Sequence, residues 1–501
     1  MLEHDRWDRD LVAQVHPRDW TNPLPAAKYD LVVIGAGTGG LVTAAGAAGL
    51  GARVALIERH LMGGDCLNVG CVPSKALISA ARAWATARHA SGEHAGPPLG
   101  IDAHGDFAAM MDRMRRIRAG LSPIDSASRF RQLGVDVFLG DGMFTDASTI
   151  TVGGATLTFR RAVIATGARA AVPTIPGLDS VRYFTNESIF DITELPARLL
   201  IVGAGPIGCE LAQCFARFGA QVTIVDKGER PLPRDDADAS RIVQEALVAE
   251  GVTFALGVDI ASVSQLGREI VVRTTCADAE TAHACDALLI ATGRAANVEG
   301  LQLERAKVAF SDKGVTVNDR FQTSNANVYA VGDVCSVLQF THAADFQARM
   351  VIQNALFFGR GKSSNLVTPW ATYTSPEVAQ VGHTAASAAL AGVQVQTFTV
   401  PLHDVDRARL EGDTAGFCRV HVRQGSDTIV GATIVAPNAG DMISEITLAM
   451  TNGLGLGAIG RTMHPYPTHG EVLRKVADSW RRTKLTPFVK QLFTRYFSLF
   501  R

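Results

Sequence analysis

One pattern occurs twice in the chain and constrains its fold more than any other feature. Each copy is a short apolar run followed by a G-x-G-x-x-G turn, with residues 31–34 before Gly35, Gly37 and Gly40, and residues 199–202 before Gly203, Gly205 and Gly208. In such a turn the first glycine permits a tight bend, the second lets the backbone approach a pyrophosphate, and the third lets helix and strand pack closely. We therefore predict an α/β fold with two Rossmann-like dinucleotide-binding domains.

An acid ends the strand that follows each turn. Glu58 and Asp226 each stand 23 residues after the first glycine of their own turn, close to the ~20 expected of an acid that binds ribose hydroxyls. An Ala-Thr-Gly segment also recurs, and it adds the candidate cofactor-binding residues Thr166, Gly167 and Gly293. Two nucleotide sites in one chain imply two cofactors, and the simplest pair is a tightly held FAD and a transient NAD(P)H.

The residues around Asp226 bear on the choice between NADH and NADPH. A 2′-phosphate would meet the carboxylate of Asp226, and this favours NADH. Lys227, Arg230 and Arg234 follow at once and would suit such a phosphate. NADH is the favoured donor, and NADPH stays open.

Two of the eight cysteines, Cys66 and Cys71, differ from the others in their position. They stand where a helix is expected to begin, and a helix N-terminus stabilises a thiolate and lowers its pKa, so both suit reversible redox chemistry. The alternatives are a metal clip or two buried thiols. A zinc site would usually need two further Cys or His ligands at short spacing. No such second pair stands out, so no metal site is predicted.

The segment around this pair resembles a known active-site signature. Its sequence is Gly-Gly-x-Cys-x-x-x-Gly-Cys-x-Pro-Ser-Lys, from Gly63 to Lys75. This is similar to the class I pyridine nucleotide–disulfide oxidoreductases, which depend on FAD. The resemblance runs over residues 29–478. It is closest to the mercuric reductase-like branch, with dihydrolipoamide dehydrogenase next.

The resemblance implies roles for individual residues. Cys71 would be the thiolate against the flavin, and Cys66 the outer thiol that meets the substrate. Lys75 would lie near the flavin N5 and pair with Glu210. The second FAD segment would contribute the remaining cofactor-binding residues, namely Gly332, Asp333 as the acid that holds the ribitol, and Ala344 in the strip beside the flavin.

One segment departs from the family pattern. Members that act on lipoamide or glutathione have a His-Pro-Thr-x-x-Glu segment, supplied by the partner subunit. Aligning residues 464–471 on it matches Glu471 but puts Tyr466 at the position of the catalytic base. Tyrosine, with an ordinary pKa near ~10, is a poor base at neutral pH. His464 and His469 flank the site, and a catalytic and a structural role are both open for them.

The departures narrow the function to three hypotheses. The first is a mercuric reductase-like enzyme whose acceptor is a metal ion or a small oxidant, although the chain lacks the terminal cysteine pair that delivers mercury in that branch. The second is dihydrolipoamide dehydrogenase or another disulfide reductase. The third is a membrane-associated protein that passes electrons to a quinone or a protein partner. All three imply a homodimer, because the site joins both subunits.

The rest of the sequence sets the organisation. We expect helices over 75–89 and 107–133, joined by a Gly/Pro/His loop. The formal net charge is −1, so no global field favours nucleic acid, and a polar N-terminus predicts a cytoplasmic protein. The predicted segments are an N-terminal extension (1–28), an FAD-binding domain (29–197), an NAD(P)-binding domain (198–297), an FAD-binding return segment (298–367), an α+β dimerisation domain (368–480) and a basic tail (481–501).

The tail has a composition of its own. Residues 480–501 contain six basic residues and no acid. Thr486 and Pro487 predict the cap and first residue of a helix. Apolar side chains recur on one face of it, at Val489, Leu492, Phe493, Tyr496 and Phe500. Such a helix suits either an anionic membrane surface or packing on its own dimer.

Overall fold

The computed structural model describes residues 5–89, 106–277 and 279–501, and the loop expected between the two long helices lies outside them. The chain forms two compact units. Unit 1 comprises Met1–Gly203, Cys214–Val225 and Val258–Asn365. Unit 2 comprises Ala204–Gln213, Asp226–Gly257 and Leu366–Arg501.

Unit 1 is built on a sheet whose central strands are parallel. The strand order is β3-β2-β1-β6, with β18 paired to β6 on its other side. These strands are β1 (Tyr29–Ile34), β2 (Val54–Glu58), β3 (Val135–Leu139), β6 (Ala155–Ile164) and β18 (Val328–Ala330). Both faces of β2 are buried, which explains its continuous apolar run. The carboxyl ends of such strands form one edge, where ligands of α/β sheets bind.

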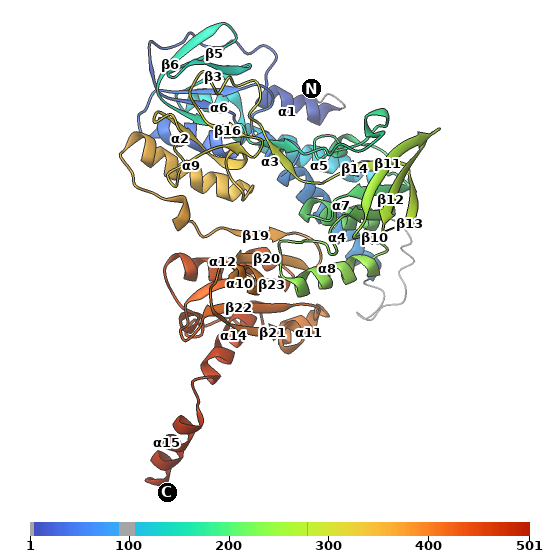
Figure 1. Cartoon of the computed structure of the whole chain (residues 1–501), viewed down its shortest axis with the longest axis vertical. Coiled ribbons are helices and arrows are strands. Elements are labelled where there is room, and N and C mark those ends of the chain that lie inside the picture. Colours follow the sequence, from blue (N-terminus) through green and yellow to red (C-terminus); the bar gives the residue numbers. More distant parts are fainter. Residues whose placement is uncertain (1–4, 90–105, 278) are drawn as a thin grey trace. The chain divides into compact units, whose positions relative to one another are not determined.

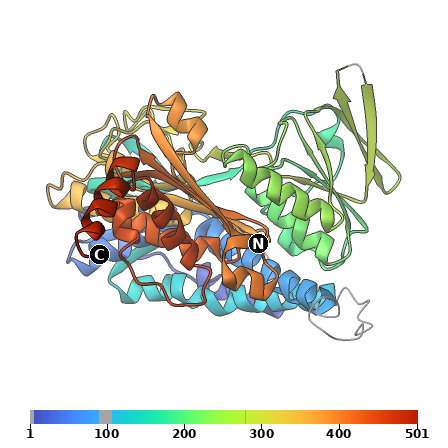
Figure 2. The ribbon, with the colours of Figure 1, turned by 90° about the horizontal axis from the view of Figure 1, so that it is seen from below.

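Two pairs of helices belong to unit 1. α2 (Thr38–Gly49) packs on α9 (Thr341–Leu356) (Figure 1), and α4 (Cys71–His89) lies beside α5 (Phe107–Leu121) (Figure 2). The helix expected over 107–133 is wrong in its extent. α5 ends at Leu121, and a new helix, α6 (Ala127–Gln132), starts after Ser126. Pro123 lies between them, and proline breaks a helix because it has no N–H to donate.

The N-terminal extension is part of unit 1. It forms helix α1 (Arg6–Val15), which packs on α5. Asp8 is fully buried, and its Oδ1 lies 2.6 Å from Nη2 of Arg118, which is itself fully buried. Nη1 of Arg118 donates a hydrogen bond to the carbonyl of Asn68 at 2.8 Å. The extension therefore supports the segment between the two redox cysteines.

The second glycine turn also follows a parallel strand. β8 (Arg198–Val202) pairs with β9 (Gln221–Asp226) on one side and β14 (Ala287–Ile290) on the other, and α7 (Pro206–Arg217) follows β8. An antiparallel sheet belongs to the same part of the sequence and consists of β11 (Asp259–Leu266), β12 (Glu269–Cys276) and β13 (Ala279–Cys285).

Unit 2 is dominated by an antiparallel sheet of five strands. Their order is β19 (Pro369–Thr372), β20 (Glu377–Gly382), β23 (Ile429–Ala436), β22 (Phe417–Arg423) and β21 (Val395–Pro401). α12 (Ala439–Thr451) packs on β20 and β23, and α14 (Glu471–Arg482) packs on β21 and β22. An apolar core packs between them, with Ile434, Ile446 and Val476 among its most buried side chains.

The tail forms the expected helix. α15 (Pro487–Ser498) starts with Thr486, whose side chain accepts a hydrogen bond from the N–H of Val489. It buries none of its residues, and it extends away from α14 in Figure 1. Among the described residues, no helix is long and apolar enough to cross a membrane.

Candidate functional site

The first glycine turn has a geometry that only glycine allows. Gly35 has a φ of 100°, and a Cβ there would lie 2.4 Å from the carbonyl oxygen of Ala165. A Cβ on Gly40 would lie 1.8 Å from the carbonyl oxygen of Gly35. Gly37 caps α2 in an extended conformation. The turn therefore presents the free N–H groups of a helix start, which suit a pyrophosphate.

The acid after each turn holds that turn in place. Glu58 is buried and accepts hydrogen bonds from the N–H groups of Ala36 at 2.7 Å and His60 at 2.8 Å. Burial raises the pKa of Glu58, against these bonds. In unit 2, Asp226 accepts from the N–H groups of Ala204 and Gly228, each at 2.6 Å. Both predicted acids thus lie under a turn, where ribose hydroxyls would reach them.

The second turn shows room for a ligand. A Cβ on Gly203 would lie 2.4 Å from the carbonyl oxygen of Ala291, so packing requires glycine there. A Cβ on Gly205 would meet nothing within 4 Å. Protein packing therefore does not demand glycine at this second position. A pyrophosphate that approaches the backbone does demand it, so the residues present fit a dinucleotide.

The two Ala-Thr-Gly segments meet in unit 1. Thr166 donates to the carbonyl of Asn297 at 2.7 Å, and the Asn297 side chain donates back to the Thr166 carbonyl at 2.9 Å. Gly167 and Gly293 both have positive φ angles, of 67° and 134°. The short strands that follow, β7 (Ala168–Ala170) and β15 (Arg294–Ala296), pair with each other. The repetition seen in the sequence is therefore a structural pair.

The cysteine pair lies at the start of α4, next to the first turn. Cys71 is the first residue of α4, as predicted, whereas Cys66 lies inside the short helix α3 (Gly64–Asn68). The two thiols interact with each other. Thr341, the first residue of α9, places its Oγ1 3.4 Å from the sulfur of Cys71.

The two sulfurs are not equivalent. We predicted a lowered pKa for both cysteines, and this is wrong for Cys66. The hydrogen bond with Cys71, burial and the charge of Cys71 raise the pKa of the Cys66 thiol. A negative charge on Cys71 opposes a second one on Cys66, so the reduced pair carries a single thiolate.

Glycine lets the cysteine loop approach the first turn. Gly64 has a φ of 59°, and a Cβ there would lie 2.6 Å from the Cα of Gly37. A Cβ on Gly332 would lie 3.4 Å from the Cβ of Ala344, and a Cβ on Gly39, in the first turn, would lie 3.8 Å from the same atom. The predicted FAD-binding residues of unit 1 and the redox pair are therefore brought to one place.

An ion-pair chain that sequence reasoning missed joins these parts. The guanidinium of Arg294 pairs with Asp65, the residue before Cys66, and its Nε lies 3.2 Å from Oδ2 of Asp333. Arg294 is 17% exposed and also donates to the carbonyl of Ala168 at 2.8 Å. Burial raises the pKa of Asp333, and Arg294 opposes that shift. The one sequence signal is that Arg294 follows the second Ala-Thr-Gly segment, whereas alanine follows the first.

The structure gives the position of Lys75 and of Glu210, which were predicted to pair beside the flavin. Lys75 lies in the first turns of α4, four residues after Cys71. Glu210 is buried in α7, where it accepts a hydrogen bond from the N–H of Tyr373 at 2.8 Å. Their pairing with each other stays a prediction.

The 464–471 segment of unit 2 is fixed by several side chains. The hydroxyl of Tyr466 donates to Oδ2 of Asp406 at 3.0 Å, and this bond raises the pKa of Tyr466. His464 has its Nε2 3.1 Å from both carboxylate oxygens of Glu445 and is only 7% exposed. Glu471 is buried and pairs with Arg474 at 2.8 Å. A histidine held by a carboxylate suits a structural role and also a catalytic one, so both predicted roles of His464 stay open.

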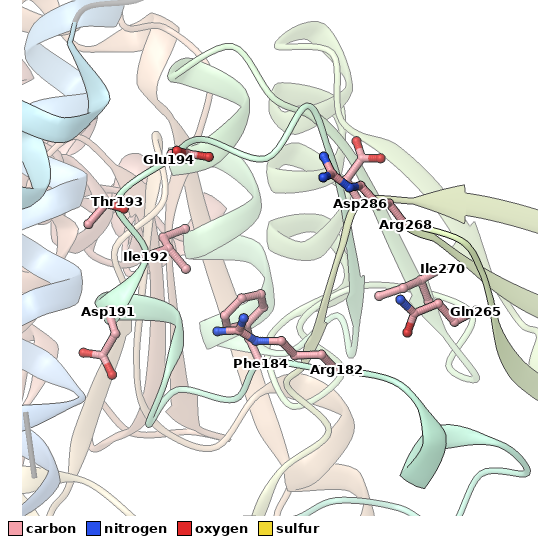
Figure 3. A pocket seen from close by; sticks show the side chains of 10 residues that line it. All are labelled: Arg182, Phe184, Asp191, Ile192, Thr193, Glu194, Gln265, Arg268, Ile270 and Asp286. Carbon is pink, nitrogen blue, oxygen red and sulfur yellow. The ribbon is translucent and has the colours of Figure 1, made fainter. Parts of the chain in front are cut away.

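A cavity elsewhere in unit 1 contains none of the predicted site residues. Its volume is about 440 Å³, and it opens between the 182–194 segment and the β11–β12 hairpin. Figure 3 shows Arg182 beside Phe184 and Arg268 near Asp286, and Arg182 lies 5.5 Å from the Phe184 ring centre. Asp286 is already paired with Arg198 at 2.7 Å.

Comparisons with known proteins agree with this geometry. Residues 29–348 match the family model described as pyridine nucleotide-disulphide oxidoreductase, and residues 368–477 match its dimerisation domain. A mercuric reductase of Staphylococcus aureus is 34% identical over 90% of this chain and 82% of its own length. A dihydrolipoyl dehydrogenase of Chlamydia muridarum is 33% identical over 89% and 95%. The solved structure of the HOCl-induced flavoprotein disulfide reductase RclA of Escherichia coli matches with a TM-score of 0.79 and 28% identity, over 90% of this chain and 99% of that one.

Proposed function

The chain belongs to the pyridine nucleotide–disulphide oxidoreductase family, and we propose that it passes electrons from NAD(P)H to the Cys66–Cys71 disulfide and on to a metal ion or a small oxidant. When bound, FAD supplies the two-electron transfer between the nicotinamide and the disulfide. The first glycine turn, Glu58 and Asp333 would hold it. Reduction adds two electrons and one proton to the disulfide and leaves a thiol on Cys66 and a thiolate on Cys71. The acceptor removes the two electrons, the proton leaves, and the S–S bond forms again.

The hydrogen bond between Tyr466 and Asp406 is the observation that favours a metal ion or a small oxidant as the acceptor. A thiol substrate needs a base that shuttles its proton. The phenol of Tyr466 donates a hydrogen bond to Asp406, and its raised pKa leaves still less phenolate to act as a base at neutral pH. His464 is held by Glu445 and is nearly closed to solvent. A metal ion or a small oxidant takes electrons without such a base, and therefore fits the segment better than a dithiol does.

The alternative is dihydrolipoamide dehydrogenase or another disulfide reductase. It is supported by dihydrolipoyl dehydrogenases among the relatives and by His469, which is not held by a hydrogen bond at Nε2. In either case residues 464–471 would face the cysteine pair of a second subunit. We therefore propose a homodimer built through the dimerisation domain.

A panel of acceptors tests the proposal on the holoenzyme. NADH oxidation is followed with Hg(II), Cu(II), lipoamide, glutathione disulfide and a quinone. We expect the highest kcat/KM with a metal ion, loss of that activity in Cys71→Ser, and no change in Cys276→Ser, an exposed cysteine outside the site. Efficient NAD⁺-dependent oxidation of dihydrolipoamide would overturn the assignment.

We propose NADH as the donor. Arg230, one of the cations that would suit a 2′-phosphate, donates instead to the carbonyls of Pro233 at 2.9 Å and Asp235 at 3.1 Å. The carboxyl group of Asp226 lies beside the turn, where it accepts a hydrogen bond from the N–H of Ala204. We expect kcat/KM for NADH to exceed that for NADPH. The Asp226→Ala variant should have a smaller ratio of these two values than the wild type. A higher kcat/KM for NADPH in the wild type would contradict this.

For the tail we propose contact of a cytoplasmic protein with an anionic membrane surface. α15 buries none of its residues in unit 2, and its exposed apolar side chains include Phe488, Leu492 and Tyr496. Basic residues without an acid complement anionic lipid. The protein is expected to sediment with vesicles that contain phosphatidylglycerol and not with phosphatidylcholine alone, and deletion of residues 486–501 should abolish this. A deletion that instead turns a dimer into a monomer would assign the tail to a second copy.

A further inference from the structure

A cluster of three metal-ligating side chains lies in unit 2, away from the cysteine pair in the sequence. Its members are Glu411, Asp413 and His469, and their donor atoms all lie within 4.8 Å of one another. Glu411 is the last residue of α11 (Asp406–Glu411), and Asp413 follows it after Gly412, which has a φ of 77°. His469 comes from the segment that carries Tyr466. Two distant parts of the sequence thus bring oxygen and nitrogen donors close together.

The imidazole of His469 is the observation that points to a ligand. Its Nε2 is sealed from solvent and has no hydrogen-bond partner among the described residues, and the side chain is only 13% exposed. The nearest acid oxygen, Oε2 of Glu411, is 3.6 Å away. That is too far for a hydrogen bond, but it is close to the spacing of two donors that share a cation at about 2.0–2.2 Å from each.

The donors of the cluster also favour a cation. Arg407 pairs with Oε1 of Glu411 and leaves Oε2 on the side of His469. Asp413 adds a second carboxylate to the cluster, so two acidic side chains and one imidazole offer donors to a cation. A neutral imidazole is also the form that binds a metal.

We infer that Glu411, Asp413 and His469 form a binding site for a divalent transition cation. One imidazole nitrogen and two carboxylate oxygens suit Zn(II) or Cu(II) and not a soft ion that prefers thiolates. The cation would tie the 464–471 segment to α11, where the bond from Tyr466 to Asp406 already attaches it. The inference does not rest on the proposed acceptor, since the site needs neither cysteine.

Zn(II) binding by calorimetry tests the site on the chelator-treated, air-oxidised holoenzyme. We expect His469→Gln and Asp413→Asn each to weaken Zn(II) binding by about tenfold or more, which corresponds to about 1.4 kcal/mol. His403→Gln is the matched control, because His403 also lies beside an acid, Asp404 at 3.7 Å, but is 64% exposed. It should bind Zn(II) like the wild type. A Cys66→Ser/Cys71→Ser variant should also bind Zn(II) like the wild type.

Spin-echo spectroscopy with Cu(II) provides a second readout. The wild type and His403→Gln should show the nitrogen modulation of a bound imidazole, and His469→Gln should lose it. No Zn(II) uptake by the wild type would overturn the inference, as would equal affinity in His469→Gln. If His469→Gln does not fold, the Asp413→Asn variant, whose substitution is exposed, tests the inference in its place. Equal Zn(II) affinity in that variant and the wild type would then overturn the inference.

Discussion

The Nε of Arg294 lies 3.2 Å from Oδ2 of Asp333, and the same guanidinium pairs with Asp65. The acid expected to hold the flavin ribitol and the loop that carries Cys66 therefore share one partly buried cation. A cation in this position balances two carboxylates, of which that of Asp333 is largely buried and that of Asp65 is partly exposed. It also fixes the redox pair relative to the predicted FAD site, because one rigid planar group contacts both.

Replacing Arg294 with methionine should destabilise unit 1 and weaken FAD retention. Removal of one partner from a largely buried ion pair costs about 3 kcal/mol. Urea unfolding and FAD release on gel filtration measure the two effects. Arg169→Met is the control, because its pair with Glu299 is exposed and should change stability by less than about 1 kcal/mol. Equal losses in both variants would argue against a special role of Arg294.

Asp8→Ala should destabilise the protein although the residue is far from the cysteines in the sequence. The substitution leaves the guanidinium of Arg118 buried and unpaired, at a cost of about 3–5 kcal/mol. Arg118 also holds the carbonyl of Asn68, so the rate of disulfide reduction should fall too. Asp10, exposed on the same helix, gives the control Asp10→Ala, which should stay within about 0.5 kcal/mol. Stopped-flow reduction and urea unfolding provide the measurements.

Gly64→Ala should abolish FAD binding. The new Cβ would lie 2.6 Å from the Cα of Gly37, and backbone cannot yield as a flexible side chain can. The control variant Gly51→Ala introduces backbone strain without this clash. Gly51 also has a positive φ, of 88°, but a Cβ there meets nothing within 4 Å. It should cost about 1–2 kcal/mol and keep the flavin, as the absorbance of the purified protein will show.

His421 should make unit 2 sensitive to acid. The side chain is fully buried and bonded to Thr397 at 2.8 Å, and burial lowers its pKa below the ordinary 6.5. As the pH falls below 6.5, the unfolded chain takes up a proton before the folded one does. Stability should therefore be level above pH 6.5 and fall below it, by at most about 1.4 kcal/mol per pH unit.

Urea unfolding at pH 7.5 and 5.5 measures this dependence. A His421→Gln variant should lose part of the slope, whereas His403→Gln, an exposed histidine, should keep it. An unchanged slope in His421→Gln would assign the acid sensitivity to other groups.

The sequence by itself determined the parts whose chemistry is local. Gly35 and Gly203 are required by a positive φ and a close carbonyl, and such turns have a fixed spacing that can be read directly. The start of α4 at Cys71 and the cap of α15 at Thr486 also follow from neighbouring residues. The sequence after Phe107 predicts one long helix, but the first helix ends at Leu121, just before Pro123.

Only the tertiary structure decided which distant side chains meet. Arg294 and Asp65 are 229 residues apart, and Asp8 and Arg118 are 110 apart. His469 and Glu411 are separated in the sequence by two strands and two helices. The tertiary structure also decided that Cys71 and burial raise the pKa of the Cys66 thiol. Pairing over such separations leaves no periodic pattern in a sequence, because it depends on how whole elements pack and on how far that packing excludes water.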